Sequence, residues 1–150
     1  MSPAPPVPLF IDTAAFFARF NTRAIEHARA RAVFAGIRSG DLQYDPLFTS
    51  RYVLSKLATL LLRKVSHRAA VNALGTIREA DSFNILTVGG STFDRVCEQF
   101  GQYADQQISF VDHSSAVLAD DRGIEHVFTF DRSDFRTLGF TVVPADTGGV

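Results

Sequence analysis

Residues 10–20, FIDTAAFFARF, contain the transition that decides the fold of this chain. The first two of them end an apolar run, Val7–Ile11, which has the length of a buried strand. Pro8 near the start of this run is unusual inside a sheet. Asp12 and Thr13 then open a helix through the end of the segment, because their side chains can accept hydrogen bonds from the free amides of a first helical turn. A buried strand followed at once by a helix indicates an α/β fold.

The same alternation continues along the rest of the chain. Further strands are expected over residues 42–44, 83–88, 126–130 and 140–143, and further helices over 21–37, 51–65, 67–80, 92–103 and 109–123. Helices between strands place the strands in parallel and cover both faces of the sheet. We predict a three-layer α/β/α domain over residues 7–144, with a mostly parallel sheet of about five strands. A flexible lead-in (1–6) and a loose tail (145–150) flank it.

The net charge of −1 over 150 residues hides a division of the chain. Residues 1–75 carry ten Lys/Arg and four Asp/Glu, whereas residues 76–150 carry five and twelve, so the halves have net charges of +6 and −7. Charges divided in this way indicate separate tasks rather than an even coat for solubility. A hydrophobic content of 46% is typical of a globular chain.

The composition also excludes several classes of protein. A single cysteine, Cys97, excludes an internal disulfide and a cysteine-based zinc cluster, and we expect its side chain to be buried. No apolar run approaches the roughly 20 residues that span a bilayer. The first residues have neither the basic nor the apolar region of a signal peptide. We therefore expect a cytoplasmic protein that does not enter a membrane.

Three aspartates lie in otherwise apolar segments. Asp12 follows the first expected strand, Asp131 follows the strand expected over 126–130, and Asp112 lies in the first turn of a helix. Each alone can be explained as a helix cap, a turn residue or a first-turn charge. Together, at one edge of one sheet, they favour a shared Mg²⁺ or Mn²⁺ ion, because buried carboxylates require a compensating positive charge. Carboxylates that hold such ions serve phosphodiester hydrolysis.

These segments resemble the PIN-domain family and, within it, the VapC-like toxin ribonucleases of type II toxin–antitoxin systems. The resemblance runs from about Leu9 to Pro144. FIDTAAFFARF is similar to the family's first strand with its first acid, and the SFVD and TFDR segments are similar to those of the third and fourth acids. The resemblance implies a PIN-like fold and an endoribonuclease that hydrolyses RNA with a metal-activated water. Its metal-binding and catalytic residues would be Asp12, Asp112 and Asp131, with Mg²⁺ or Mn²⁺ as cofactor.

Lys56 departs from the family pattern, because the family's second acid, a Glu, falls at this position. A protonated lysine cannot bind a metal ion, but its ammonium could lie among the three aspartates as a substitute cation. Opposite charges about 4 Å apart interact by roughly 1 to 4 kcal/mol, depending on the effective dielectric constant. Three explanations stay open: an impaired site, a compensating acid at Asp134 or Asp45, or a Lys56 that points to solvent beside a weak metal site. Selection or design against a toxic activity is a further origin for this lysine.

Other residues are expected to contact the substrate or a partner. Arg132, beside Asp131, and Thr13, beside Asp12, are candidates for binding the substrate. The first two helices carry five arginines that suit either a phosphate-binding surface or a solvated helix face, namely Arg19, Arg23, Arg29, Arg31 and Arg38. The resemblance implies RNA as substrate, a cognate antitoxin protein as partner, and a homodimer.

Two other classes of function compete with the nuclease. One is a catalytically inactive PIN module that binds RNA or an antitoxin-like protein, which Lys56 favours. The other is a receiver or nucleotide-binding domain. It is disfavoured because no paired acids follow the first strand and the segment Gly89–Ser91 lacks the spacing of a phosphate-binding loop.

Overall fold

The computed structural model describes residues 5–148 of the chain. Five strands make up the sheet: β1 (Val7–Ile11), β2 (Tyr44–Ser50), β3 (Phe83–Leu86), β4 (His126–Phe128) and β5 (Thr141–Val143). Seven helices lie between them: α1 (Thr13–Phe20), α2 (His27–Ser39), α3 (Arg51–Lys64), α4 (His67–Glu79), α5 (Gly90–Gln102), α6 (Phe110–Asp121) and α7 (Arg132–Thr137).

The sheet is parallel throughout, in the order β3-β2-β1-β4-β5. The central strand β1 pairs with β2 on one side and with β4 on the other, so that Phe10 lies opposite Phe48 and Val127. Leu9, Phe10 and Ile11 are completely buried, as expected for a strand covered on both faces. The predicted α/β fold with a five-stranded sheet is therefore confirmed.

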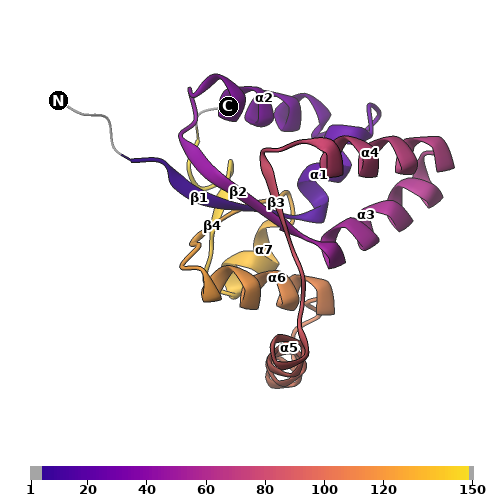
Figure 1. The fold of residues 1–150 in the computed structure, drawn as a ribbon. Coiled ribbons are helices and arrows are strands. Elements are labelled where there is room, and N and C mark those ends of the chain that lie inside the picture. The colour runs from indigo at the N-terminus through magenta and orange to yellow at the C-terminus, as the bar shows by residue number, and fades with distance from the viewer. Residues whose placement is uncertain (1–4, 149–150) are drawn as a thin grey trace.

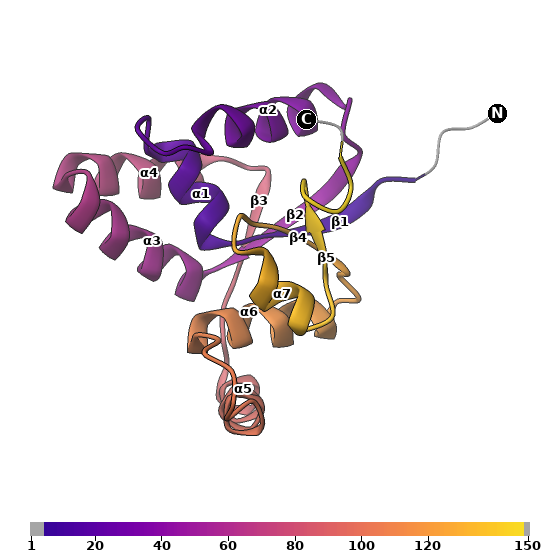
Figure 2. The same cartoon turned by 180° about the vertical axis from the view of Figure 1, so that it is seen from behind.

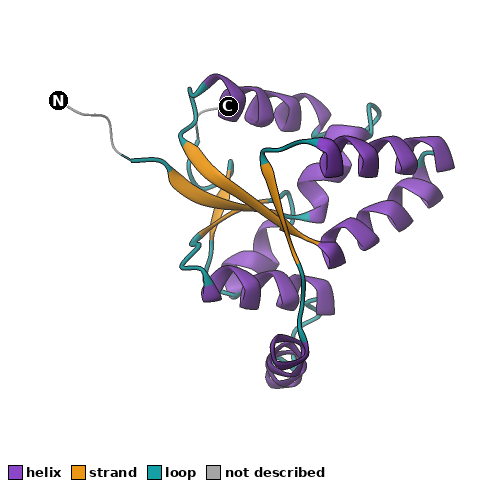
Figure 3. Ribbon diagram, in the orientation of Figure 1, coloured by secondary structure: helices purple, strands orange, loops and turns teal. Residues whose placement is uncertain are grey.

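Helices cover the sheet in two groups (Figures 1 and 3). Helices α1 to α4 pack as a chain of neighbours, α2 on α1, α1 on α3 and α3 on α4, while α6 and α7 lie on the other side of the strands. Helix α5 lies farthest from the sheet and packs on α6, as the view from behind also shows (Figure 2). The core under the first group contains a cluster of aromatic rings, in which Phe34 lies 5.8 Å from Phe16 and 5.0 Å from Phe128.

The second strand is longer than predicted and lies elsewhere. We expected a strand over 42–44 only, and residues such as Asp45 and Pro46 are rare in strands. The structure extends β2 to Ser50, since Leu47 and Phe48 pair with Leu9 and Phe10 of the central strand. Asp45, which we placed at the end of the second strand, is therefore the second residue of β2.

Two helix predictions were also wrong. Helix α2 begins at His27 rather than at Asn21, because residues 21–26 form turns whose amides bond to Asn21. Residues 132–137, where no helix was predicted, form α7, which Phe135 anchors to the core with a fully buried ring.

The carboxyl ends of β1, β2 and β4 lie at one edge of the sheet, where α1, α3 and the loop to α7 begin. Among residues 5–148, no helix is both long and apolar enough to cross a membrane. Residues 1–4 of the predicted lead-in and 149–150 of the predicted tail lie outside the described residues, and the domain bounds 7 and 144 stay a prediction.

Candidate active site

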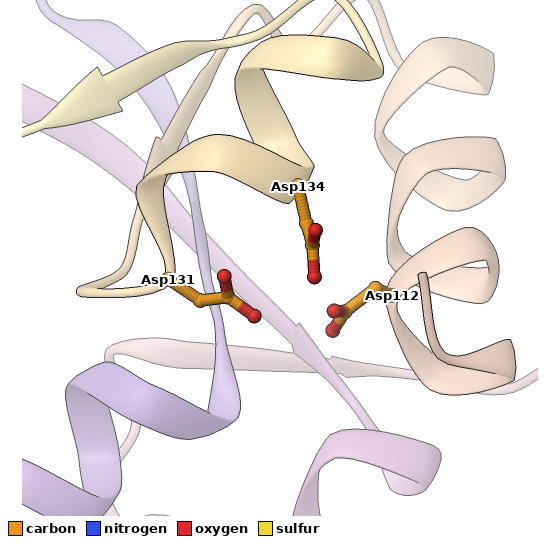
Figure 4. A group of neighbouring side chains, drawn as sticks. All are labelled: Asp112, Asp131 and Asp134. Atoms are coloured by element: carbon orange, nitrogen blue, oxygen red, sulfur yellow. The ribbon is translucent and has the colours of Figure 1, made fainter. Parts of the chain in front are cut away.

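Three carboxylates meet at this edge of the sheet. Asp112 comes from the first turn of α6, Asp131 immediately precedes α7, and Asp134 lies in the first turn of α7. Each offers an oxygen within 4.8 Å of the others, and the three side chains point into one space (Figure 4). Of the two acids proposed to compensate for Lys56, the structure therefore brings Asp134 to the site, whereas Asp45 lies at the opposite end of its strand.

Asp12 lies at the end of β1 beside this group. It caps α1, and its Oδ2 accepts hydrogen bonds from Thr129 Oγ1 at 2.8 Å and from the amide of Ala14 at 3.4 Å. Its Oδ1 is buried and has no hydrogen-bond partner among residues 5–148. A buried acceptor without a donor is energetically unfavourable, so this oxygen is available to a cation.

Thr129 is a positioning residue that the sequence analysis missed. Its hydroxyl donates to Asp12 and accepts from the amide of Asp131 at 3.0 Å, so it joins the ends of β1 and β4. A threonine two residues before an acid is a local signal for such a bond to the backbone. The bond to Asp12 spans 117 positions and has no local signal.

Burial and mutual repulsion disfavour charge on these carboxylates. Burial raises the pKa of Asp12, and burial followed by the charge of Asp12 raises the pKa of Asp112 to about 7. Burial, then the charge of Asp134, raises the pKa of Asp131 to about 6. The ammonium of Lys56 acts in the opposite direction on all three pKa values but does not outweigh these causes.

Lys56 lies at the site rather than in solvent. Its Nζ donates to Ser109 Oγ at 3.4 Å and lies 4.0 Å from Asp112 Oδ1, with 36% of the side chain exposed. Ser109 also caps α6 by accepting from the amide of Asp112 at 3.1 Å. Sequence reasoning missed Ser109, which connects the lysine to the carboxylate. The explanation in which Lys56 points away from the acids is wrong.

The structure places the other predicted residues as follows. Arg132 is exposed at the first position of α7, next to Asp131. Thr13 is 2% exposed, and its Oγ1 has no hydrogen-bond partner in the described part of the chain. His113 is buried, and its Nδ1 hydrogen-bonds to the side-chain amide of Gln99 at 2.8 Å. Cys97 was predicted to be buried, which is wrong, because it lies exposed on α5.

The oxygens present fit a divalent cation. Mg²⁺ and Mn²⁺ prefer carboxylate oxygen, and this edge of the sheet holds an orphaned buried oxygen and a close group of three carboxylates. The raised pKa values indicate that the group lacks sufficient positive charge of its own.

Together, the parallel three-layer fold and the acids beyond its central strands define a PIN-type α/β protein with an acidic centre. The PIN domain family matches residues 9–140, and the chain belongs to this family and, within it, to the VapC-like toxin ribonucleases.

Individual relatives agree with this assignment. The chain is 30% identical over 135 residues to the 23S rRNA-specific endonuclease VapC20 of Mycobacterium tuberculosis, covering 90% of this chain and 97% of that protein. The crystal structure of VapC20, a sarcin–ricin loop cleaving toxin, superposes with a TM-score of 0.79 at 29% identity, over 89% of this chain and 96% of that one. FitAcB from Neisseria gonorrhoeae shares the fold, with a TM-score of 0.61 at 14% identity over 89% and 95% of the two chains.

Proposed function

We propose that this chain is a divalent-metal-dependent endoribonuclease whose cation is held by Asp12, Asp112, Asp131 and Asp134. The observation that carries the proposal is the convergence of these acids without enough positive charge to balance them. A bound Mg²⁺ or Mn²⁺ ion would supply Lewis acidity and lower the pKa of a coordinated water. The reaction joins a water oxygen to phosphorus and breaks the bond from phosphorus to a ribose oxygen, which takes up a proton.

The chain's own residues have separate parts in this proposal. Thr129 holds Asp12 in place by donating a hydrogen bond to its carboxylate. Ser109 holds Asp112 in place by accepting a hydrogen bond from its backbone amide. Arg132 is exposed beside Asp131, where a guanidinium can bind a substrate phosphate. Thr13 was predicted to bind substrate, and that role stays a prediction.

Lys56 weakens the metal site in this proposal. Its ammonium, 4.0 Å from Asp112 Oδ1, neutralises part of the charge that would attract the cation. We therefore expect Lys56→Glu to tighten metal binding and to increase cleavage. The alternative function, an inactive PIN module that binds RNA or an antitoxin-like protein, is favoured by the same contact.

Cleavage of labelled single-stranded RNA by the purified protein with Mn²⁺ tests the proposal. Asp112→Asn should lower the cleavage rate by roughly 100-fold or more. Loss of a group that only supports a metal ligand already costs up to about 100-fold in activity, and Asp112 is proposed as a ligand itself. Thr137→Val, an exposed change at the far end of α7, is the control. If both the natural sequence and Lys56→Glu leave the RNA intact, the nuclease proposal is wrong. Calorimetry without Mn²⁺ heat would then support the inactive module.

The relatives suggest a substrate and partners. VapC20 acts on 23S rRNA, so 23S rRNA and its sarcin–ricin loop are the first substrates to test. Because that relative is a toxin, we propose a cognate antitoxin for this chain as well, a cytoplasmic location and a homodimer. Phe93 and Phe100 on α5, 40% and 46% exposed, are candidates for the dimer contact, which light scattering of Phe93→Ser/Phe100→Ser would test.

A further inference from the structure

The hairpin of α3 and α4 carries a concentrated positive charge that the acidic centre does not use. Residues 51–80 contain six Lys/Arg and a single acid, Glu79. Lys56 belongs to the centre described above. Among residues 5–148, neither Arg51 nor Arg78 forms an ion pair, so both guanidinium groups are free to bind an anion.

Arg51 and Arg78 flank a cavity of about 480 Å³ between α3, α4 and β3. Its walls are largely apolar and consist of Leu54, Ala58, Leu74 and Ile85. A cavity of this size falls within the range of small-ligand sites. Apolar walls with two cations at the rim suit a nucleotide, whose base is flat and largely apolar on its faces and whose phosphate is negative.

This cavity adjoins a second cavity that Lys56 lines. Ser55 lines it and also lines a second cavity, of about 290 Å³, together with Tyr52, Lys56 and Thr59. Arg51 and Ser55 share one face of α3, and Tyr52 and Lys56 share the next, because residues four apart on a helix are neighbours. The two cavities therefore adjoin at Ser55, and the second one is lined by Lys56, whose Nζ lies 4.0 Å from Asp112 Oδ1.

The cavity and Lys56 lie on the same helix. Arg51 and Lys56 are five positions apart on α3, about 7.5 Å along its axis and about 140° around it. By contrast, the arginine-lined cavity of α1 and α2, about 400 Å³ around Arg19, Arg31 and Arg38, shares no lining residue with the cavity at Lys56.

We propose that the cavity between Arg51 and Arg78 is a subsite for a nucleotide of single-stranded RNA that flanks the phosphate at the acidic centre. The two guanidinium groups bind a phosphate, and Leu54, Ala58, Leu74 and Ile85 contact the base. This inference rests on the proposed ribonuclease function, since it assumes that the strand also reaches the carboxylates.

Fluorescence anisotropy with a labelled single-stranded oligoribonucleotide in EDTA tests the subsite, because no cleavage competes with binding. Arg51→Gln/Arg78→Gln should weaken binding about tenfold and reduce the dependence of log K on log salt by about 0.7 for each lost phosphate contact. Ala58→Met, which fills the cavity without changing charge, should also weaken binding. Arg63→Gln/Arg68→Gln removes the same charge from exposed positions of the same hairpin and is the matched control.

The outcomes separate the subsite from general charge and from the nuclease proposal. Equal losses in the Arg63/Arg68 control, or in Arg31→Gln/Arg38→Gln on α2, would overturn the subsite, as would unchanged binding by Ala58→Met or no binding by the natural sequence. Thermal melting verifies that each variant is folded. Cleavage with Mn²⁺ is measured in parallel, so an inactive protein that still shows the predicted binding pattern refutes only the nuclease proposal.

Discussion

At the scale of single residues, the acidic centre depends on side chains that carry no charge. Thr129 Oγ1 donates to Asp12 and accepts from the amide of Asp131, while Ser109 Oγ accepts both from Lys56 and from the amide of Asp112. Hydroxyl groups serve this purpose because one oxygen can donate and accept at once. Carboxylates from separate elements are thereby held in one orientation before any ligand binds.

Thr129→Val tests this role, because valine keeps the shape and removes the hydroxyl. We expect a 10- to 100-fold loss of Mn²⁺ affinity, roughly the range for outer groups of metal sites, measured by calorimetry. Loss of this hydrogen bond to the buried Asp12 Oδ2 should also reduce the free energy of unfolding by about 1 to 3 kcal/mol. Thr137→Val is the control, since its hydroxyl bonds only to the carbonyl of Ser133 on an exposed helix. Unchanged Mn²⁺ affinity in Thr129→Val would contradict the positioning role.

At the scale of elements, α7 presents two of the four acids although it has only six residues. A helix this short is not stable by itself. Phe135, completely buried and 6.3 Å from Phe140, anchors it to the loop before β5. The positions of Asp131 and Asp134 therefore depend on an apolar contact of the same short helix.

Phe135→Ala should consequently affect both stability and the metal site. Removing a buried phenylalanine reduces the free energy of unfolding by about 3 to 5 kcal/mol, which chemical denaturation would measure. We also expect weaker Mn²⁺ binding at temperatures where the variant remains folded, because α7 loses its anchor. Val71→Ala on α4, where the residue is 54% exposed, should have a smaller effect on stability and none on Mn²⁺ binding. If the folded Phe135→Ala protein bound Mn²⁺ normally, α7 would hold its acids without this anchor.

At the scale of the whole molecule, the acids make stability depend on pH and on metal. Burial raises the pKa of Asp112 from 3.8 to about 7 and that of Asp131 from 3.8 to about 6. Between about pH 4 and pH 7, the metal-free folded protein retains protons that the unfolded chain has released. The contribution of these groups to the free energy of unfolding therefore falls as pH rises, and it is least favourable above pH 7.

Thermal melting in EDTA should show this loss of stability between pH 5 and pH 8. Mn²⁺ should reverse it, with a larger increase in melting temperature at pH 8 than at pH 5, because protons compete with the cation for the carboxylates. Asp112→Asn provides the control: without metal, its melting temperature should change less with pH, and Mn²⁺ should stabilise it less. An equal Mn²⁺ effect at both pH values would argue against a cation bound to these acids.

Much of the fold was predictable from local patterns. Apolar runs alternate with helical segments, and this periodicity indicates parallel strands covered by helices, as observed. The three aspartates were identifiable because each interrupts an apolar segment, and charge is rare in buried positions. The two errors in the sheet region, β2 and α7, concern segments in which long-range pairing or a single buried ring outweighs local preference.

Only the tertiary structure could decide which other groups join the aspartates. Asp134 and Asp45 are equivalent as sequence, but α7 brings one to Asp112, whereas the extended β2 carries the other to the far end of the sheet. Likewise, the approach of Lys56 to Asp112 depends on how α3 packs against α6. Apolar periodicity is a property of neighbours along the chain, whereas the meeting of charges far apart in sequence depends on how whole elements pack.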